Sequence, residues 1–254
     1  DAGRRGEALT AAEDAAEIYR RLAAANPAAH EPDLARALFN LGHQLSDAGR
    51  RGEALTAAED AAEIYRRLAA ANPAAHEPDL AASLSDLSVA LADAGRRAEA
   101  LPAAEDAVEI RQRLAAANPA AYEPGLARSL TNLGTRLWEA ERWAEALTAL
   151  KAAVRIWRQM AAANPPSTSD LTHALSIWAL VLATVGNLPA ALSATEEAVE
   201  SCRPHVATMP SLIPGLHRVL DLQVRLLEAL GRTQDAATVR HWLEESPPPP
   251  DSHN

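Results

Sequence analysis

Aromatic residues, cysteine and lysine are scarce in this sequence. Aromatic side chains make up 4% of the 254 residues, with a single phenylalanine, and Lys151 is the only lysine. Because β-branched residues are also sparse while alanine, leucine, glutamate and arginine dominate, the composition favours an all-helical protein. Cys202 is the single cysteine, so no internal disulfide can form and a reducing, cytoplasmic compartment is expected.

Positive charge is also in short supply. The chain carries 24 Lys and Arg against 34 Asp and Glu, which gives a net charge of −10 and a pI near 5.3. This balance argues against nucleic acid or an anionic membrane surface as the main partner. The most apolar run, residues 175–185, is too short to cross a bilayer, and no secretory segment opens the chain.

Motifs for catalysis and cofactor binding are missing as well. Gly49-Arg50-Arg51-Gly52 lacks the preceding strand and the following Lys-Ser/Thr of a phosphate-binding loop. The eight histidines have no metal-ligand spacing, with His30 and His76 expected in turns, and no G-x-S-x-G nucleophile motif is present. Paired acids such as Glu13-Asp14 recur with the repeat described below, which indicates a solvated helix face. The sequence therefore predicts no enzyme, no metal and no cofactor.

A long internal repeat is the main feature that the sequence does contain. Residues 1–35 recur without a change as residues 47–81, a drifted copy begins at Asp93, and looser copies follow from Glu139 and Thr184. A period of about 46 residues is typical of helical solenoids, in which each unit contacts its neighbours and the core is continuous. The chain is therefore predicted to be an array.

Each unit is predicted to be a pair of antiparallel helices. Residues 5–25 carry small and apolar side chains at helical spacing, and Asn26-Pro27 should end this helix. The next helix should begin near Pro32, bury the stripe Leu34, Leu38, Leu41 and Leu45, and end at Gly49. Continued along the chain, this predicts about eleven helices and no strand. The predicted order is a half unit at 1–26, pairs near 32–71, 78–117, 124–163, 169–204 and 212–245, and a disordered proline-rich tail at 246–254.

The stretch 126–163 carries the clearest resemblance to a known family. Asn132-Leu133-Gly134 is followed at fixed intervals by Ala146, Leu150 and Ala153, a pattern that resembles the tetratricopeptide repeat. In that family a Leu-Gly pair in the first helix meets small residues of the second helix where the two cross. The unit here is about a dozen residues longer than the usual ~34. It is more similar to the elongated repeats of kinesin light chains, and to arrays behind the ATPase modules of bacterial signalling proteins of the STAND type. We expect a longer second helix and a longer inter-helix turn to absorb the extra length.

The resemblance implies a right-handed superhelical α-solenoid whose first helices line a concave groove for proteins or peptides. On this register Phe39 and Trp138 are candidate anchors, since aromatic side chains dominate interface hot spots; the alternative for both is ordinary packing between helices. The family's carboxylate clamp is only partly matched, by Arg128 and Asn132. The expected groove positions are Arg36, Phe39, Asn40, His43, Arg128, Thr131, Asn132, Thr135, Trp138, His173, Arg218 and Arg225, together with Ser85, Val89, Ser176 and Asp221.

The two closest copies differ in one short window. All differences fall in residues 36–46 against 82–92, where the leucines of the buried stripe are kept and the intervening residues change. One interpretation is that the groove has diversified on a copied scaffold. The alternative is drift after a recent duplication.

Two classes of function are compatible with these features. The leading hypothesis is a non-catalytic array that binds a protein or peptide, as the recognition or scaffold region of a larger bacterial signalling protein. The alternative is a structural solenoid whose near-identical repeats stack head to tail. The charge of a partner stays open, because the arginines of the predicted groove favour an acidic peptide while Asp86, Glu139 and Asp221 weaken that field.

Overall fold

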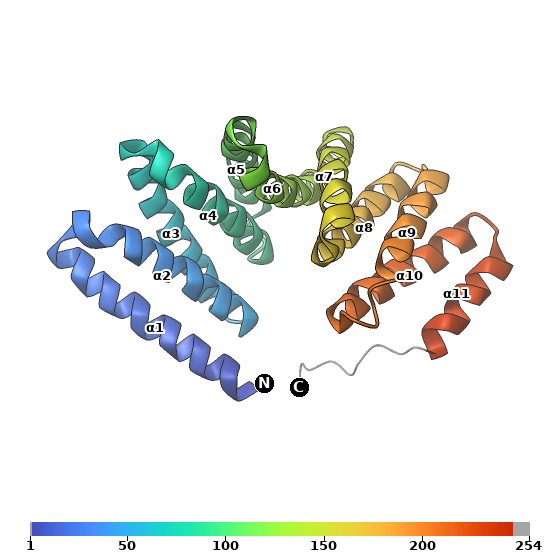
Figure 1. Cartoon of the computed structure of the whole chain (residues 1–254), viewed down its shortest axis with the longest axis horizontal. Helices are drawn as coiled ribbons and strands as arrows, with labels where there is room; N and C mark the ends of the chain where they lie inside the picture. Colours follow the sequence, from blue (N-terminus) through green and yellow to red (C-terminus); the bar gives the residue numbers. More distant parts are fainter. Residues whose placement is uncertain (1, 246–254) are drawn as a thin grey trace. The chain divides into compact units, whose positions relative to one another are not determined.

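The computed structural model describes residues 2–245, and within that part of the chain it contains helices and no strand. The prediction of an all-helical array of about eleven helices is thereby confirmed. Backbone contacts divide the chain into two compact units, 1–125 and 126–254, and each is described by itself. The tail at 246–254, predicted to be disordered, lies outside the described residues. The α-helices are α1 (Ala2–Ala25), α2 (Pro27–Asp47), α3 (Arg51–Ala71), α4 (Pro73–Asp93), α5 (Arg97–Ala117), α6 (Pro119–Glu139), α7 (Trp143–Ala163), α8 (Thr168–Thr184), α9 (Leu188–Cys202), α10 (Ile213–Ala229) and α11 (Thr233–Glu245) (Figure 1).

The first helices α2, α4 and α6 begin earlier than predicted. α2 starts at Pro27 and α4 at Pro73, each after a single asparagine, whereas the sequence placed these starts near Pro32 and its copy. Proline suits the first helical position because the first amides of a helix have no intrahelical partner. Pro32 lies inside α2, where it removes a single backbone hydrogen bond. The side chain of Asn72 completes the start of α4 by accepting from the Ala75 N–H at 3.4 Å.

The extra length of the repeat therefore lies in the helices. α2, α3, α4 and α5 have 21 residues each, so the predicted long second helix is confirmed. The predicted long turn is wrong, because Asn26 or Asn72 alone connects the two helices. His30 and His76, interpreted from sequence as turn residues, lie within α2 and α4 for the same reason.

The turn from each first helix to its second helix uses a left-handed residue. Gly49, Gly95, Gly186 and Gly231 have φ between 73° and 81°, a conformation that glycine adopts at little cost. The equivalent residue between α6 and α7 is Glu141, with φ of 59°. A non-glycine residue in this region costs about 1–2 kcal/mol, so the turn between α6 and α7 keeps this geometry at an energetic disadvantage.

Each unit has an apolar core of leucine and alanine. In unit 1 the predicted stripe of α2 is buried, with Leu38 1% exposed and Leu45 3%, and Leu84 occupies the equivalent place in α4 at 1%. In unit 2 the cores of α7 and α8 include Leu150 and Leu175, both 0% exposed. The outward positions of each first helix follow from this burial, because residues between the leucines lie on the opposite face.

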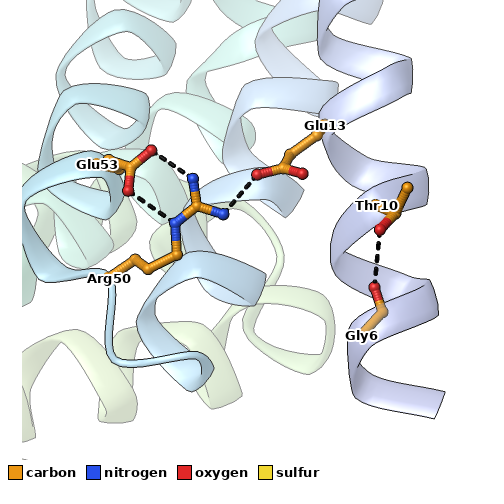
Figure 2. A network of polar contacts seen from close by, with 5 residues as sticks. All are labelled: Gly6, Thr10, Glu13, Arg50 and Glu53. Atoms are coloured by element: carbon orange, nitrogen blue, oxygen red, sulfur yellow. Dashed lines mark hydrogen bonds and ion pairs between the residues drawn. The ribbon is translucent and has the colours of Figure 1, made fainter. Parts of the chain in front are cut away.

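Arginine side chains join successive second helices at the surface. Figure 2 shows Arg50, the residue directly before α3, donating both to Glu53 of α3 at 2.7 Å and to Glu13 of α1 at 2.6 Å. One period later, Arg96 makes the same contacts to Glu99 at 2.7 Å and to Glu59 at 2.6 Å. Exposed ion pairs contribute little to stability individually. Their repetition favours one stacking register between neighbouring second helices.

Unit 2 departs from the regular repeat from α8 onward, since α8 has 17 residues rather than the 21 of α2. α9 has 15 residues rather than the 21 of α3, and it ends at Cys202. The connection to α10 then runs from Arg203 to the short turn Pro210–Leu212, where the regular repeats need one asparagine. Shortening a second helix removes atoms that would otherwise cover its neighbours.

Candidate binding surface

The predicted groove positions lie on the first helices, α2, α4, α6, α8 and α10. Most of them are at least partly open to solvent, as the leucine stripe requires. The exposed ones are Arg36, Asn40, His43, Val89, Arg128, His173, Arg218, Asp221 and Arg225, and the half-buried ones are Phe39, Asn132, Thr135, Trp138 and Ser176. This placement leaves them accessible to contact from outside the helices.

In unit 1, three of these residues share a hollow between α2 and α4. Phe39, His43 and Val89 line a space of about 110 Å³. The Phe39 and His43 rings meet edge to face, with centroids 4.8 Å apart, a favoured geometry for aromatic pairs. Ser83 lies at the base, 1% exposed, and its hydroxyl has no hydrogen-bond partner among the described residues. The hollow therefore combines an aromatic wall with a buried polar group.

An acid–base pair bridges this hollow. His43 Nε2 of α2 lies 2.7 Å from Asp86 Oδ2 of α4. The hydrogen bond to Asp86 raises the pKa of His43 above its usual 6.5, against partial desolvation, and the charge of Asp47 adds to the effect. Sequence reasoning noted Asp86 only as a negative charge. The change from Asn40 to Asp86, one of the differences between the two closest copies, was the available signal.

This pair predicts a pH-dependent contribution to the stability of unit 1. Because the folded-state pKa of His43 is raised, its contribution is fully present below pH 6.5 and is lost as the pH rises through the folded-state pKa. We expect His43→Gln to lower the free energy of unfolding by roughly 0.2–1 kcal/mol at pH 5.5, as for other exposed pairs, and by much less at pH 9.

Urea unfolding followed by circular dichroism at both pH values measures this difference. Asp86→Asn is the matched control, since it should give the same pH dependence, and the double variant should add nothing. Equal effects of His43→Gln at pH 5.5 and pH 9 would contradict the assignment.

In unit 2, the structure brings five predicted residues together around one larger hollow between α8 and α10. This hollow has a volume of about 630 Å³. Its floor includes Ile177, Leu180 and Leu222, which sequence reasoning did not select because they count as ordinary helix-packing residues. The predicted residues that line it are His173, Ser176, Arg218, Asp221 and Arg225.

The charges of this hollow are not neutralised by contacts within the protein. Arg218, Asp221 and Arg225 of α10 and Asp170 of α8 line it, and none of them makes an ion pair or hydrogen bond within the described residues. Although the His173 side chain is exposed, desolvation in the hollow lowers its pKa, and nearby Arg218 lowers it further. His173 is therefore neutral near pH 7 and offers one donor and one acceptor.

Two predicted groove residues face the core instead. Thr131 is 3% exposed and Ser85 is 5% exposed, at the place where Phe39 stands in the first copy. The Thr131 hydroxyl donates to the Ala127 carbonyl at 2.9 Å, and Ser85 does the same to Ala81 at 2.9 Å. The helix register was correct, but these short side chains stay beneath their neighbours where phenylalanine projects outward. Neither residue is available to a partner.

Other predicted residues are held by contacts inside their own unit. Trp138 donates from Nε1 to the Thr184 hydroxyl of α8 at 3.2 Å, which favours the packing interpretation over the anchor interpretation. The Thr135 hydroxyl donates to the Thr131 carbonyl at 3.0 Å. In unit 1 Arg36 pairs with Asp33 at 2.5 Å, so its guanidinium is already partly satisfied. Asn40, Arg128 and Asn132 remain at least partly open on α2 and α6.

Groups that could support other chemistry were also located. Among residues 2–245, no cluster of three or more His, Cys, Asp or Glu side chains is arranged to hold a metal ion. Cys202 is 0% exposed, burial raises the pKa of its thiol, and the sulfur lies 2.8 Å from Thr172 Oγ1. No helix in the described part of the chain has both the length and the apolar character needed to span a bilayer.

The repeat geometry matches a known family. A family model of the tetratricopeptide repeat matches residues 34–73, 80–118 and 126–167, each covering most of a first helix and all of the second helix that follows it. These three stretches match the tetratricopeptide repeat. Such repeats mediate protein–protein interactions and are typically non-catalytic scaffolds, so this array belongs to a class of protein-binding scaffolds.

Solved structures with the same fold include a protein with TPR-like repeats. The crystal structure of BtubC (BKLC) from P. vanneervenii is 17% identical, with a TM-score of 0.69 over 98% of this chain and 96% of that chain. A putative kinesin light chain from Podosopora anserina with nearly identical TPR-like repeats is 20% identical, with a TM-score of 0.64 over 83% and 93%. The apo form of RapI is 18% identical, with a TM-score of 0.62 over 84% and 69%. At these identities the similarity concerns the fold alone. No curated protein matches the sequence.

Proposed function

We propose that this array is a non-catalytic recognition module that binds a protein segment on the outward faces of its first helices. The observation that carries the proposal is the hollow between α8 and α10. Five positions selected from the repeat register line it, and its two guanidinium and two carboxylate groups have no partner within the described residues. Unpaired charged groups over an apolar floor are what a specific polar ligand can satisfy.

A protein segment suits this surface better than a compact small molecule. The α8–α10 hollow holds about 630 Å³ and is lined by residues spread over several turns of two neighbouring helices. An extended segment can place alternating polar and apolar side chains along such a surface. The mixed signs of Arg218, Asp221 and Arg225 favour a segment that carries both acidic and basic groups. The resemblance to arrays of larger bacterial signalling proteins supports a cytoplasmic recognition or scaffold role.

A selected peptide with a charge-reversed variant tests this proposal. We would select a twelve-residue peptide from a random phage library on the full chain and measure its affinity in solution. Arg218→Glu with Arg225→Glu should weaken binding roughly tenfold or more, because buried charged contacts dominate such interfaces.

The control is Arg155→Glu, which makes the same kind of charge reversal once, at an exposed position of α7. It should leave the affinity unchanged, and circular dichroism should show that all variants remain helical. Equal affinities for the α10 variant and the wild type, or equal losses for both variants, would overturn the proposed surface.

A self-associating solenoid is the second candidate, and one observation favours it. Ile18 is 47% exposed on α1, although its counterpart Ile64 in the identical stretch of α3 is 7% exposed. Leu22 is also 39% exposed. Another repeat, from the same polypeptide or from a second copy, would cover this face. Light scattering across protein concentrations separates the candidates, since a constant monomer mass removes self-association.

A further inference from the structure

The hollow between α2 and α4 of unit 1 is lined by two rows of residues, each following one side of a helix at successive turns. The row on α2 is Phe39, Gly42, His43 and Ser46, and the row on α4 is Asp86, Val89, Ala90 and Asp93. Arg51, Ala54 and Ala58 of α3 complete the lining together with Ser83. All of these residues belong to unit 1, so the hollow is separate from the one between α8 and α10.

Small side chains keep this hollow open. Gly42, Ala54, Ala58 and Ala90 have at most one side-chain carbon each, and they leave a space of about 110 Å³. A cavity of ~150 Å³ holds one benzene molecule. The α2–α4 hollow can therefore take the end of one side chain, but not a whole peptide segment.

The acidic groups of the hollow are only partly neutralised within the protein. Asp86 has a partner in His43, at 2.7 Å. Asp93 is exposed, and it makes no ion pair or hydrogen bond within the described residues. Arg51 is also exposed and unpaired there, so it does not neutralise Asp93. When His43 is neutral, the two carboxylates outnumber the one guanidinium, and the hollow favours a cation.

The buried hydroxyl of Ser83 points to a ligand that donates hydrogen bonds. Ser83 is 1% exposed and lines the hollow, and its Oγ atom has no partner among the described residues. The hydroxyl of Ser85, on the same helix, instead donates to a carbonyl one turn earlier. Leaving a buried hydroxyl without a partner is costly. A ligand that places an N–H group against Ser83 would remove that cost.

We propose that this hollow binds the guanidinium group of an arginine side chain from a protein partner. A guanidinium offers several N–H donors in one plane, and the carboxylates of Asp86 and Asp93 and the Ser83 hydroxyl can all accept from it. Its flat faces stack on aromatic rings, and Phe39 supplies a half-buried ring in the wall. A lysine ammonium suits the hollow less well, because it is compact and strongly hydrated.

His43 controls whether Asp86 is available to the arginine. Protonated His43 pairs with Asp86 and adds a positive charge, so it competes with an incoming cation. The charged groups around His43 are Asp47 of α2, Arg51 of α3, and Asp86 and Asp93 of α4. As the pH rises and His43 loses its proton, the arginine should bind more tightly.

The test is an NMR titration of the full chain with N-acetyl-arginine amide, whose blocked ends resemble those of a residue within a peptide. We expect millimolar binding at low salt, with shifts centred on the amides of α2, α4 and the start of α3. N-acetyl-citrulline amide has nearly the same shape without the charge, and it should bind roughly tenfold more weakly. N-acetyl-lysine amide should also bind more weakly than the arginine probe.

Three variants separate a role in binding from a role in folding. Ser83→Ala removes a hydroxyl that has no partner, so it should leave the urea midpoint unchanged or raised, yet weaken arginine binding severalfold. Arg51→Gln removes a competing positive charge and should tighten binding. Asp93→Asn should weaken binding severalfold. Asp106→Asn makes the same change at an exposed position of α5 and is the matched control, which should bind like the wild type.

The pH dependence gives a separate readout. Arginine binding should be severalfold weaker at pH 5.5 than at pH 9, and His43→Gln should remove this difference.

Several outcomes would overturn the proposal. Equal affinities for the arginine and citrulline probes would do so, as would equal losses in Asp93→Asn and Asp106→Asn, or shifts confined to α8 and α10. Free arginine that binds more tightly than the blocked probe would identify a free amino acid as the ligand, and would also overturn it. The probe contains no part of the peptide selected for the α8–α10 hollow, so the two tests fail independently.

Discussion

Replacing Leu150 by alanine should lower the free energy of unfolding of unit 2 by about 2–5 kcal/mol, the range for large-to-small substitutions in a packed core. Leu150 is 0% exposed and packs from α7 into the place left by Gly134 of α6. Alanine would remove three carbon atoms and leave a cavity that the flanking helices can fill only by moving. The adjacent Lys151 is exposed, so Lys151→Ala is the matched control and should stay within ~0.5 kcal/mol of the wild type.

The chain provides its own probe for this measurement. All five tryptophans lie between residues 138 and 242, so urea unfolding followed by tryptophan fluorescence reports on unit 2. The three tyrosines lie at 19, 65 and 122, in unit 1. A change in tyrosine signal without a change in tryptophan signal on Leu150→Ala would contradict the placement of this residue in the core of unit 2.

The second large effect is expected from Gly134→Ala. A Cβ atom at residue 134 would lie 2.5 Å from Leu150 Cγ and 2.8 Å from its Cδ2. The leucine is fully buried and cannot move into open space, so overpacking should cost about 1–3 kcal/mol. Tryptophan-monitored unfolding measures this, and combining Gly134→Ala with Leu150→Ala should cost less than the sum of the two. Strict additivity would contradict the contact.

Gly42 occupies the equivalent position in the first copy and provides the contrasting control. A Cβ there would meet the Ala54 carbonyl oxygen at 3.6 Å and Ala57 Cβ at 3.8 Å, which are ordinary contacts. Gly42→Ala should therefore be neutral or stabilise unit 1 by up to ~1 kcal/mol, because alanine is the better helix former. The second copy already carries Ser88 at this place. Destabilisation by Gly42→Ala comparable to that by Gly134→Ala would contradict this reading of the two crossings.

The helical repeat could be predicted because several independent patterns agree. The leucine stripe, the left-handed glycines and the repeated Asn-Pro stops all indicate the same helix pairs. The start of each first helix could not be fixed in the same way. Pro27 and Pro32 are both acceptable near a helix N-terminus, and Ala28, Ala29 and His30 between them fit a helix or a turn. Packing of α2 against α1 and α3 stabilises the longer helix.

The candidate binding surface was predictable to the extent that the register of each first helix determines it. His173, Arg218 and Arg225 were selected by register and meet at one hollow. Thr131 was selected by the same register and is buried, because side-chain length as well as direction decides exposure. The two hollows could not be predicted, since each depends on how neighbouring helices pack and not on a local pattern.

The most direct test of the central claim is a hydrogen-exchange footprint of the selected peptide on the full chain. The account predicts that saturating peptide slows amide exchange in α8 and α10, with little change in α7. Arg218→Glu with Arg225→Glu should remove that protection at the same peptide concentration. Protection confined to second helices such as α3, α5 or α7, with α8 and α10 unchanged, would contradict the claim that the outward faces of the first helices form the binding surface.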